Sequence, residues 1–201
     1  MISKKIIAAF VFSIVSFSAF SQVVYMKPHF GVKIGANTSY SVLTPNYTYL
    51  PKFQSHLHAG VFYRIRKNRW IFQPEAEYTV KGGTFKGATD LTANEVIRNN
   101  FNYFVLQPTV GYVVTEGLTF EAGPQFGFKI NSVGGPAKNN ETSFSVGFRY
   151  DVLDALEDVS FAIRYNHGLS NVSASSNQTV TNNTFQLSVI YNWYKKNCLR
   201  H

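Results

Sequence analysis

The chain has 201 residues, a formal net charge of +8 and a single cysteine, Cys198. One cysteine cannot form an intramolecular disulfide, which excludes a secreted domain held together by disulfide bonds. The basic residues are scattered with no run of five or more, so a nucleic-acid partner is not expected. No segment beyond the first 22 residues has 18 continuous apolar residues, so we expect no membrane-spanning helix.

The first 21 residues are typical of a secretory signal peptide. Two lysines precede an apolar stretch (6–17), and small residues within 19–21 form a cleavage site. The apolar stretch is too short, and too interrupted by serine, for a transmembrane anchor. We expect cleavage between Ser21 and Gln22, which leaves 22–201 as a single domain exported from the cytoplasm.

Eight stretches of the chain alternate apolar and polar residues, which predicts strands with one apolar and one polar face. In the fifth stretch, for example, Phe120 and Phe126 share one face, whereas Glu121 and Gln125 share the other. Each stretch has about the length of a tilted strand that crosses a membrane. The expected strands are 28–37, 55–65, 70–80, 102–113, 118–130, 142–151, 159–170 and 183–194.

The connections between these strands alternate between long and short. The long ones are 38–54, 81–101, 131–141 and 171–182, and the short ones are 66–69, 114–117 and 152–158. Outer-membrane barrels have short periplasmic turns, longer external loops and an even number of strands. The pattern therefore predicts an all-β fold, an eight-stranded antiparallel up-and-down transmembrane β-barrel in the cell outer membrane, with both termini in the periplasm.

The polar face of the predicted sheet carries charges of both signs, which must pair or be solvated when they are enclosed. Symmetric hairpins would place His58 opposite Glu77 and Glu121 close to Arg149. Because eight strands leave an interior that side chains fill, we expect no wide pore. The face also carries Lys33 and Arg64, and the expected polar network of the lumen comprises Glu75, Glu77, Glu121, Arg149, Arg164 and His58.

Aromatic residues gather where the predicted strands meet the short turns. Rings with a polar tip are favoured at a membrane–water interface, although aromatic residues are also common in strands of any kind. We interpret these residues as a periplasmic aromatic girdle: Tyr63, Trp70, Tyr112, Tyr150 and Trp193.

Three prolines, Pro74, Pro108 and Pro124, lie inside predicted strands. Proline cannot donate a ladder hydrogen bond and normally occurs at sheet edges or bulges, yet a closed barrel has no edge. We therefore expect local bulges or lost ladder bonds at these positions.

No sequence motif indicates catalysis, because G-x-S-x-G, H-E-x-x-H, C-x-x-C and Walker patterns are missing. His56 and His58 have a spacing that suits a metal, but hydrogen-bonded lumen histidines are the simpler interpretation. Glu75 and Glu77 could imitate a catalytic carboxylate pair, but arginines on the same face favour a structural ion network. We expect no enzyme activity, no catalytic residues, no cofactor and no metal.

A series of short segments occurs in a fixed order along the chain: FGVKIGAN (30–37), HAGVF (58–62), QPEAEY (73–78), KGG (81–83), LQP (106–108), EAGPQ (121–125) and RYNHGLSN (164–171). In these segments the chain resembles the PorT-like outer-membrane β-barrel family of Bacteroidetes-type bacteria. The resemblance implies the same fold and location, makes the prolines a family trait, and connects some members with protein secretion. Such chains usually end near the last aromatic residue of the final strand, whereas this one continues past Tyr194.

Three functions are compatible with the sequence. The first is a structural or interaction role through the long external loops. The second is a component or assembly factor of a protein-secretion system in the outer membrane, and the third is a secreted lipocalin-like carrier with an apolar cavity. Expected partners are outer-membrane lipid and other envelope or secretion proteins, whereas the sequence does not indicate an oligomeric state.

Overall fold

The computed structural model describes residues 27–44, 49–87, 96–133, 138–152, 156, 158–173 and 179–193. The expected signal peptide, its cleavage site and the C-terminal extension with Cys198 lie outside these ranges. Over the described ranges, no helix is long and apolar enough to cross a membrane.

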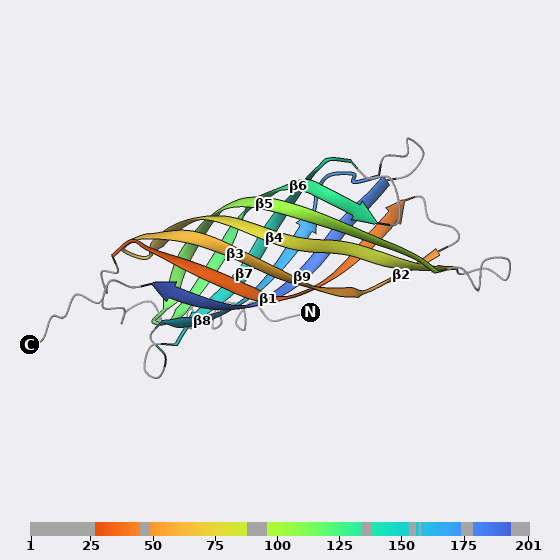
Figure 1. Cartoon of the computed structure of the whole chain (residues 1–201). Helices are drawn as coiled ribbons and strands as arrows, with labels where there is room; N and C mark the ends of the chain where they lie inside the picture. The colour runs from red at the N-terminus through yellow and green to blue at the C-terminus, as the bar shows by residue number, and fades with distance from the viewer. Residues whose placement is uncertain are drawn as a thin grey trace, which may run out of the picture.

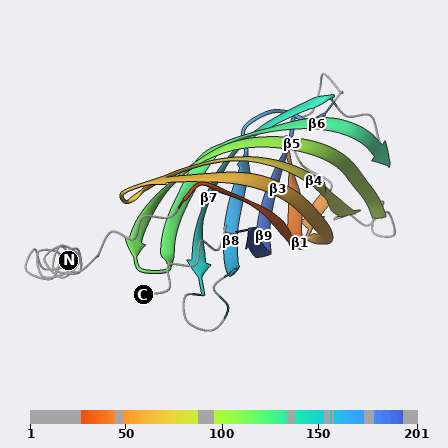
Figure 2. The ribbon, with the colours of Figure 1, turned by 60° about the vertical axis from the view of Figure 1, so that its left-hand side comes forward.

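Eight long antiparallel strands close into the expected up-and-down barrel, because β4 pairs with both β3 and β5 (Figures 1 and 2). A ninth, short strand adds to the end of β4, inside a segment that was expected to be a loop. The strands are β1 (His29–Thr44), β2 (Tyr49–Lys52), β3 (Gln54–Lys67), β4 (Trp70–Gly87), β5 (Val96–Thr115), β6 (Leu118–Val133), β7 (Asn140–Asp151), β8 (Val159–Gly168) and β9 (Thr179–Trp193).

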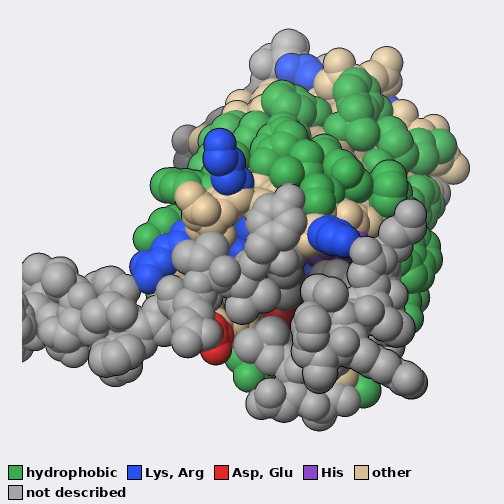
Figure 3. All heavy atoms as spheres, turned by 90° about the vertical axis from the view of Figure 1, so that its left-hand side faces the viewer, with side chains coloured by type: hydrophobic (Ala, Val, Ile, Leu, Met, Phe, Trp, Pro, Cys, Tyr) green, Lys and Arg blue, Asp and Glu red, His purple; other side chains and the backbone are tan. Residues whose placement is uncertain are grey.

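The barrel is apolar on the outside and polar on the inside. Ile34 and Leu187 are 62% and 61% exposed on the outer wall, whereas the inward-facing Glu75 and Arg149 are 4% and 0% exposed. Figure 3, a view from the end with the short turns, shows hydrophobic side chains gathered over the upper and right-hand parts of the visible surface. An apolar wall of this extent faces lipid. The lipocalin-like carrier is therefore wrong, because such a carrier needs its apolar residues inside.

The short connections at 66–69 and 114–117 are tight turns. Asn68 and Gly117 adopt positive φ angles of 56° and 82°, a conformation that asparagine and glycine tolerate better than other residues. All four long connections between the strands are shorter than expected. For example, β4 and β5 stay paired through Lys86 and Val96, although 81–101 was expected to be a loop. The alternation of apolar and polar residues in β4 ends at Val80, because side chains beyond the lipid need not be apolar. The backbone pairing of β4 with β5 continues past this point.

The three prolines interrupt the ladders without bending them into bulges. Pro74 on β4 lies opposite Pro108 on β5. The pairing of β5 with β6 is interrupted at Pro108 and Pro124 and continues beyond them in the same register. The pairing of β3 with β4 is interrupted in the same way beside Pro74. The expected loss of ladder pairing is confirmed, whereas the register shifts of β5 and β6 lie elsewhere.

One glycine allows β1 to approach its neighbours closely. Gly35 pairs with His58 on β3 and with Ser188 on β9, and a Cβ atom there would overlap the backbone oxygen of Leu187. We expect Gly35→Ala to lower the free energy of unfolding by about 1–3 kcal/mol, the usual cost of overpacking. Urea unfolding in lipid vesicles measures this change.

Gly127→Ala is the matched control for Gly35→Ala. The nearest atom to a Cβ at Gly127 is a ring carbon of Tyr103 at 3.3 Å, which can move slightly. The control should therefore cost less, and a Gly35→Ala barrel as stable as the Gly127→Ala barrel would contradict the close approach.

Candidate functional site

The candidate functional site is the interior of the barrel, where charged side chains from many strands meet. Five cationic and five carboxylate side chains are buried there, so the described interior is balanced in formal charge. Burial of charge requires pairing and hydrogen bonding. The ten residues are Lys33, Arg64, Lys81, Arg149, Arg164, Glu75, Glu77, Glu121, Glu141 and Asp151.

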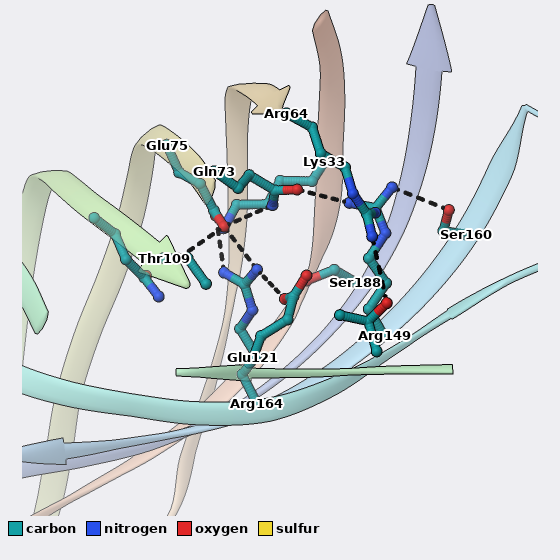
Figure 4. A network of polar contacts seen from close by, with 12 residues as sticks. Lys33, Arg64, Gln73, Glu75, Thr109, Glu121, Arg149, Ser160, Arg164 and Ser188 are labelled. Atoms are coloured by element: carbon teal, nitrogen blue, oxygen red, sulfur yellow. Dashed lines mark hydrogen bonds and ion pairs between the residues drawn. The ribbon is translucent and has the colours of Figure 1, made fainter. Parts of the chain in front are cut away.

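Glu75 lies at the centre of the first cluster (Figure 4). Its two carboxylate oxygens accept hydrogen bonds of 2.7 and 2.8 Å from the Arg164 guanidinium. Lys33 forms ion pairs with both Glu75 and Glu77, and Arg164 also pairs with Glu121 at 2.6 Å. The cluster therefore joins β1, β4, β6 and β8 across the lumen.

Arg149 organises a second cluster nearer the short turns. It pairs with Asp151 at 2.8 Å, and Asp151 also lies 3.5 Å from a guanidinium nitrogen of Arg64. Gln73 connects this cluster with the first, because its amide oxygen accepts from Arg149 at 3.1 Å and its amide nitrogen donates to Glu75 at 2.9 Å.

A third cluster lies toward the end with the long connections. Lys81 pairs with Glu141 at 3.0 Å and donates to the Gln125 amide oxygen at 2.7 Å. Gln125 in turn donates to Gln107 at 3.1 Å. Lys81 and Glu141 had been assigned to loops, although both continue the inward alternation of their strands.

The register changes one of the expected neighbours. His58 lies opposite Thr79 rather than Glu77, because the two-residue turn after Lys67 shifts the pairing by two. Glu121 lies diagonally across from Arg149, which pairs with Thr119, but the two side chains form ion pairs with Arg164 and Asp151 instead of with each other. A ring nitrogen of His58 lies 2.8 Å from the Ser188 hydroxyl.

Small apolar clusters also occupy the interior, although its expected content was polar. Phe62, Ala162 and Ile190 form one of them, and the Arg149 guanidinium lies 5.2 Å from the centre of the Phe62 ring. A second cluster comprises Phe101, Tyr103 and Val105. These residues fill the space between charged groups and add to the closure of the lumen.

The five girdle residues lie on the outer wall at the end with the short turns. Trp70 and Tyr112 are paired across β4 and β5, with ring centroids 5.1 Å apart. The Tyr63 ring packs against the Phe30 ring at a tilt, with ring centroids 4.6 Å apart. Tyr150 and Trp193 are both 53% exposed. Their placement at the membrane interface stays a prediction.

The described interior has the chemistry of a structural network. Its carboxylates are in ion pairs with lysine or arginine, and ion-paired carboxylates are poor candidates for proton transfer. Among the described residues, no group of three His, Cys, Asp or Glu side chains could hold a metal ion. The arrangement can close the lumen and hold opposite strands together.

Comparisons with known proteins agree with this architecture. Ail, the attachment invasion locus protein of Yersinia pestis, superposes with a TM-score of 0.50 at 12% identity, over 84% of this chain and 100% of Ail. Neisserial surface protein A (NspA) superposes with a TM-score of 0.52 at 11% identity, over 83% of this chain and 99% of NspA. At these identities the similarity shows the fold alone, and no curated protein matches the sequence.

The sequence itself also matches a family. The model of the outer membrane protein beta-barrel domain family matches residues 7–192, which is most of the chain. With the apolar outer wall and the closed strand order, this match places the protein in the cell outer membrane. The chain belongs to the outer membrane protein beta-barrel domain family.

Proposed function

We propose that the protein is a closed, non-catalytic barrel that anchors its external segments in the outer membrane and presents them to partners. The observation that carries the proposal is the cluster around Glu75, which joins Lys33, Glu121 and Arg164 across the lumen. A barrel crossed by such a cluster lacks a wide aqueous path, so the protein acts through its surfaces.

Within the family, the segment order described above supports assignment to the PorT-like barrels. Envelope or secretion proteins are then the partners that the proposal favours. Ail and NspA are named for attachment and invasion and for the cell surface. Both names refer to the cell exterior, and they support the proposal of an external role for this barrel.

Site-specific photocrosslinking in cells tests the proposal. A photoreactive amino acid at Leu50 on β2, which is 58% exposed, samples the external end of the barrel. The same amino acid at Asn68, in the β3–β4 turn, samples the periplasmic end. An external role predicts protein crosslinks from Leu50 and few from Asn68.

The matched positions separate this role from the alternative in protein secretion. Strong crosslinks from Asn68 to periplasmic or secretion proteins, with none from Leu50, would favour the assembly-factor function and overturn the external one. Crosslinks to lipid alone at both positions would overturn any protein-binding role.

A further inference from the structure

Four inward-facing residues on the neighbouring strands β8, β9 and β1 form a compact polar patch in the lumen. Asn166 on β8 lies opposite Thr184 on β9. Gln186, two residues further along β9, lies opposite Asn37 on β1. Directly opposed residues of antiparallel strands share a face, as do residues two apart on one strand. None of the four side chains is more than 2% exposed, so the patch is sealed from bulk solvent.

The patch contains polar atoms that no described residue satisfies. Neither the amide oxygen nor the amide nitrogen of Asn166 has a hydrogen-bond partner among the described residues. The same holds for the Thr184 hydroxyl, Gln186 Oε1 and Asn37 Oδ1. Buried polar groups are nearly always hydrogen-bonded, because burying one without a partner is costly. Five such atoms on one patch therefore indicate a bound partner.

The bonds that the patch does make define the chemistry of this partner. Gln186 Nε2 donates to the Glu77 carboxylate at 2.8 Å. Asn37 Nδ2 likewise donates to the Val80 backbone oxygen at 2.6 Å. Since these two oxygens accept hydrogen bonds, the amide nitrogens must face them, and the amide oxygens are left to the patch. With Asn166 Oδ1, three of the five atoms are acceptors only, so the partner must donate hydrogen bonds.

Short side chains surround the patch and leave room for a small partner. The row of inward residues that contains Asn166 and Thr184 continues through Gly123 on β6, Ser145 on β7 and Ser39 on β1. Ordinary side chains just fill the interior of an eight-stranded barrel. A row without a long side chain therefore leaves space between its members.

Charged layers close this space on both sides along the barrel axis. Toward the short turns, Arg164 pairs with Glu75 and Glu121. Toward the external end, Lys81 pairs with Glu141. The described buried charges of the lumen already balance, so an ion between the layers would add a charge without a counterion. A small neutral molecule is therefore favoured over an ion.

We propose that Asn37, Asn166, Thr184 and Gln186 bind an enclosed cluster of ordered water molecules. Opposed side chains start about 4.5–5.5 Å apart at their Cβ atoms, a separation that a water with two hydrogen bonds bridges. Water donates two hydrogen bonds and accepts two, which suits three acceptors, a hydroxyl and an amide nitrogen. The cluster connects β8, β9 and β1 between the charged layers without opening a path through the barrel.

A crystal structure of the full-length, detergent-purified barrel, at a resolution that shows ordered water, tests the site. We expect water oxygens about 2.7–3.2 Å from the Asn166 amide and the Thr184 hydroxyl. The same crystals of Asn166→Leu should lose the water that contacts the amide, because leucine is similar in size to asparagine and has no polar atoms.

Asn192→Leu is the matched control for Asn166→Leu in urea unfolding in lipid vesicles. Asn192 is 0% exposed in the lumen, but its amide oxygen accepts from Arg149 and its amide nitrogen donates to Ser160. Asn192→Leu should therefore lower the urea midpoint, whereas Asn166→Leu should keep it close to that of the wild type. Heat-modifiable gel mobility checks that each variant forms a barrel.

Three results would overturn the proposal. The first is an Asn166 amide that bonds directly to protein groups. The second is an ion, a detergent molecule or no ordered density at the patch. The third is a fall of the urea midpoint in Asn166→Leu as large as in Asn192→Leu, because Asn166 would then bond to protein rather than to water.

Discussion

Replacing Arg164 with methionine should lower the free energy of unfolding by about 3–5 kcal/mol, the cost of leaving buried charge without its partner. Arg164 pairs with Glu75 and Glu121, and its removal leaves three carboxylates of the central cluster with Lys33 alone. The methionine side chain is similar in length to that of arginine and carries no charge. The loss of stability should therefore come mainly from the lost ion pairs rather than from lost volume. Urea unfolding in lipid vesicles gives the value.

Arg66→Met is the control, because Arg66 lies at the β3–β4 turn and donates to the Asn68 backbone oxygen on the surface. It should cost no more than about 1 kcal/mol. Adding Glu121→Gln to Arg164→Met should restore part of the stability, since one unpaired carboxylate is then removed. If Arg164→Met is no more harmful than Arg66→Met, the central cluster does not stabilise the barrel.

Replacing Val189 with arginine should cost about 2–4 kcal/mol, the value for arginine on a barrel's lipid face near the bilayer midplane. Val189 is 47% exposed on the outer wall, at the middle of the outward residues of β9 that run from Phe185 to Trp193. Folding titrations from denaturant into vesicles measure the cost.

Val42→Arg is the matched control, since Val42 also faces outward but lies beyond the apolar part of β1, on the far side of Thr38. Arginine near the interface costs only about 0–1 kcal/mol. Equal costs at Val189 and Val42 would mean that the position of the membrane on the barrel is assigned wrongly.

The fold could be predicted because its main signal is local. In a strand between lipid and a polar lumen, apolar and polar side chains alternate from one residue to the next, as Phe120 and Glu121 do. The alternation did not predict a strand at 81–87. There β4 continues beyond the lipid, so a charged residue such as Lys86 can face outward. Strand ends above the membrane are set by backbone pairing, which has little effect on composition.

The sequence predicts which residues face inward, but it does not predict which of these residues contact one another. Alternation identifies Glu75 and Arg164 as inward residues without saying which residue each one meets. Glu75 on β4 and Arg164 on β8 are not on neighbouring strands, so their contact depends on the tilt and closure of the whole barrel. Even on adjacent strands, the two-residue turn at 68–69 places His58 opposite Thr79 rather than the expected Glu77.

Conductance of the purified protein in a planar lipid bilayer tests most directly whether the lumen is closed. The ion pairs from Asp151 near the short turns, through Glu75, to Glu141 near the external end cross an interior that eight strands leave narrow. We predict at most small, flickering currents in the wild-type barrel. Large, steady currents like those of a porin would contradict the closed lumen and indicate a transport channel.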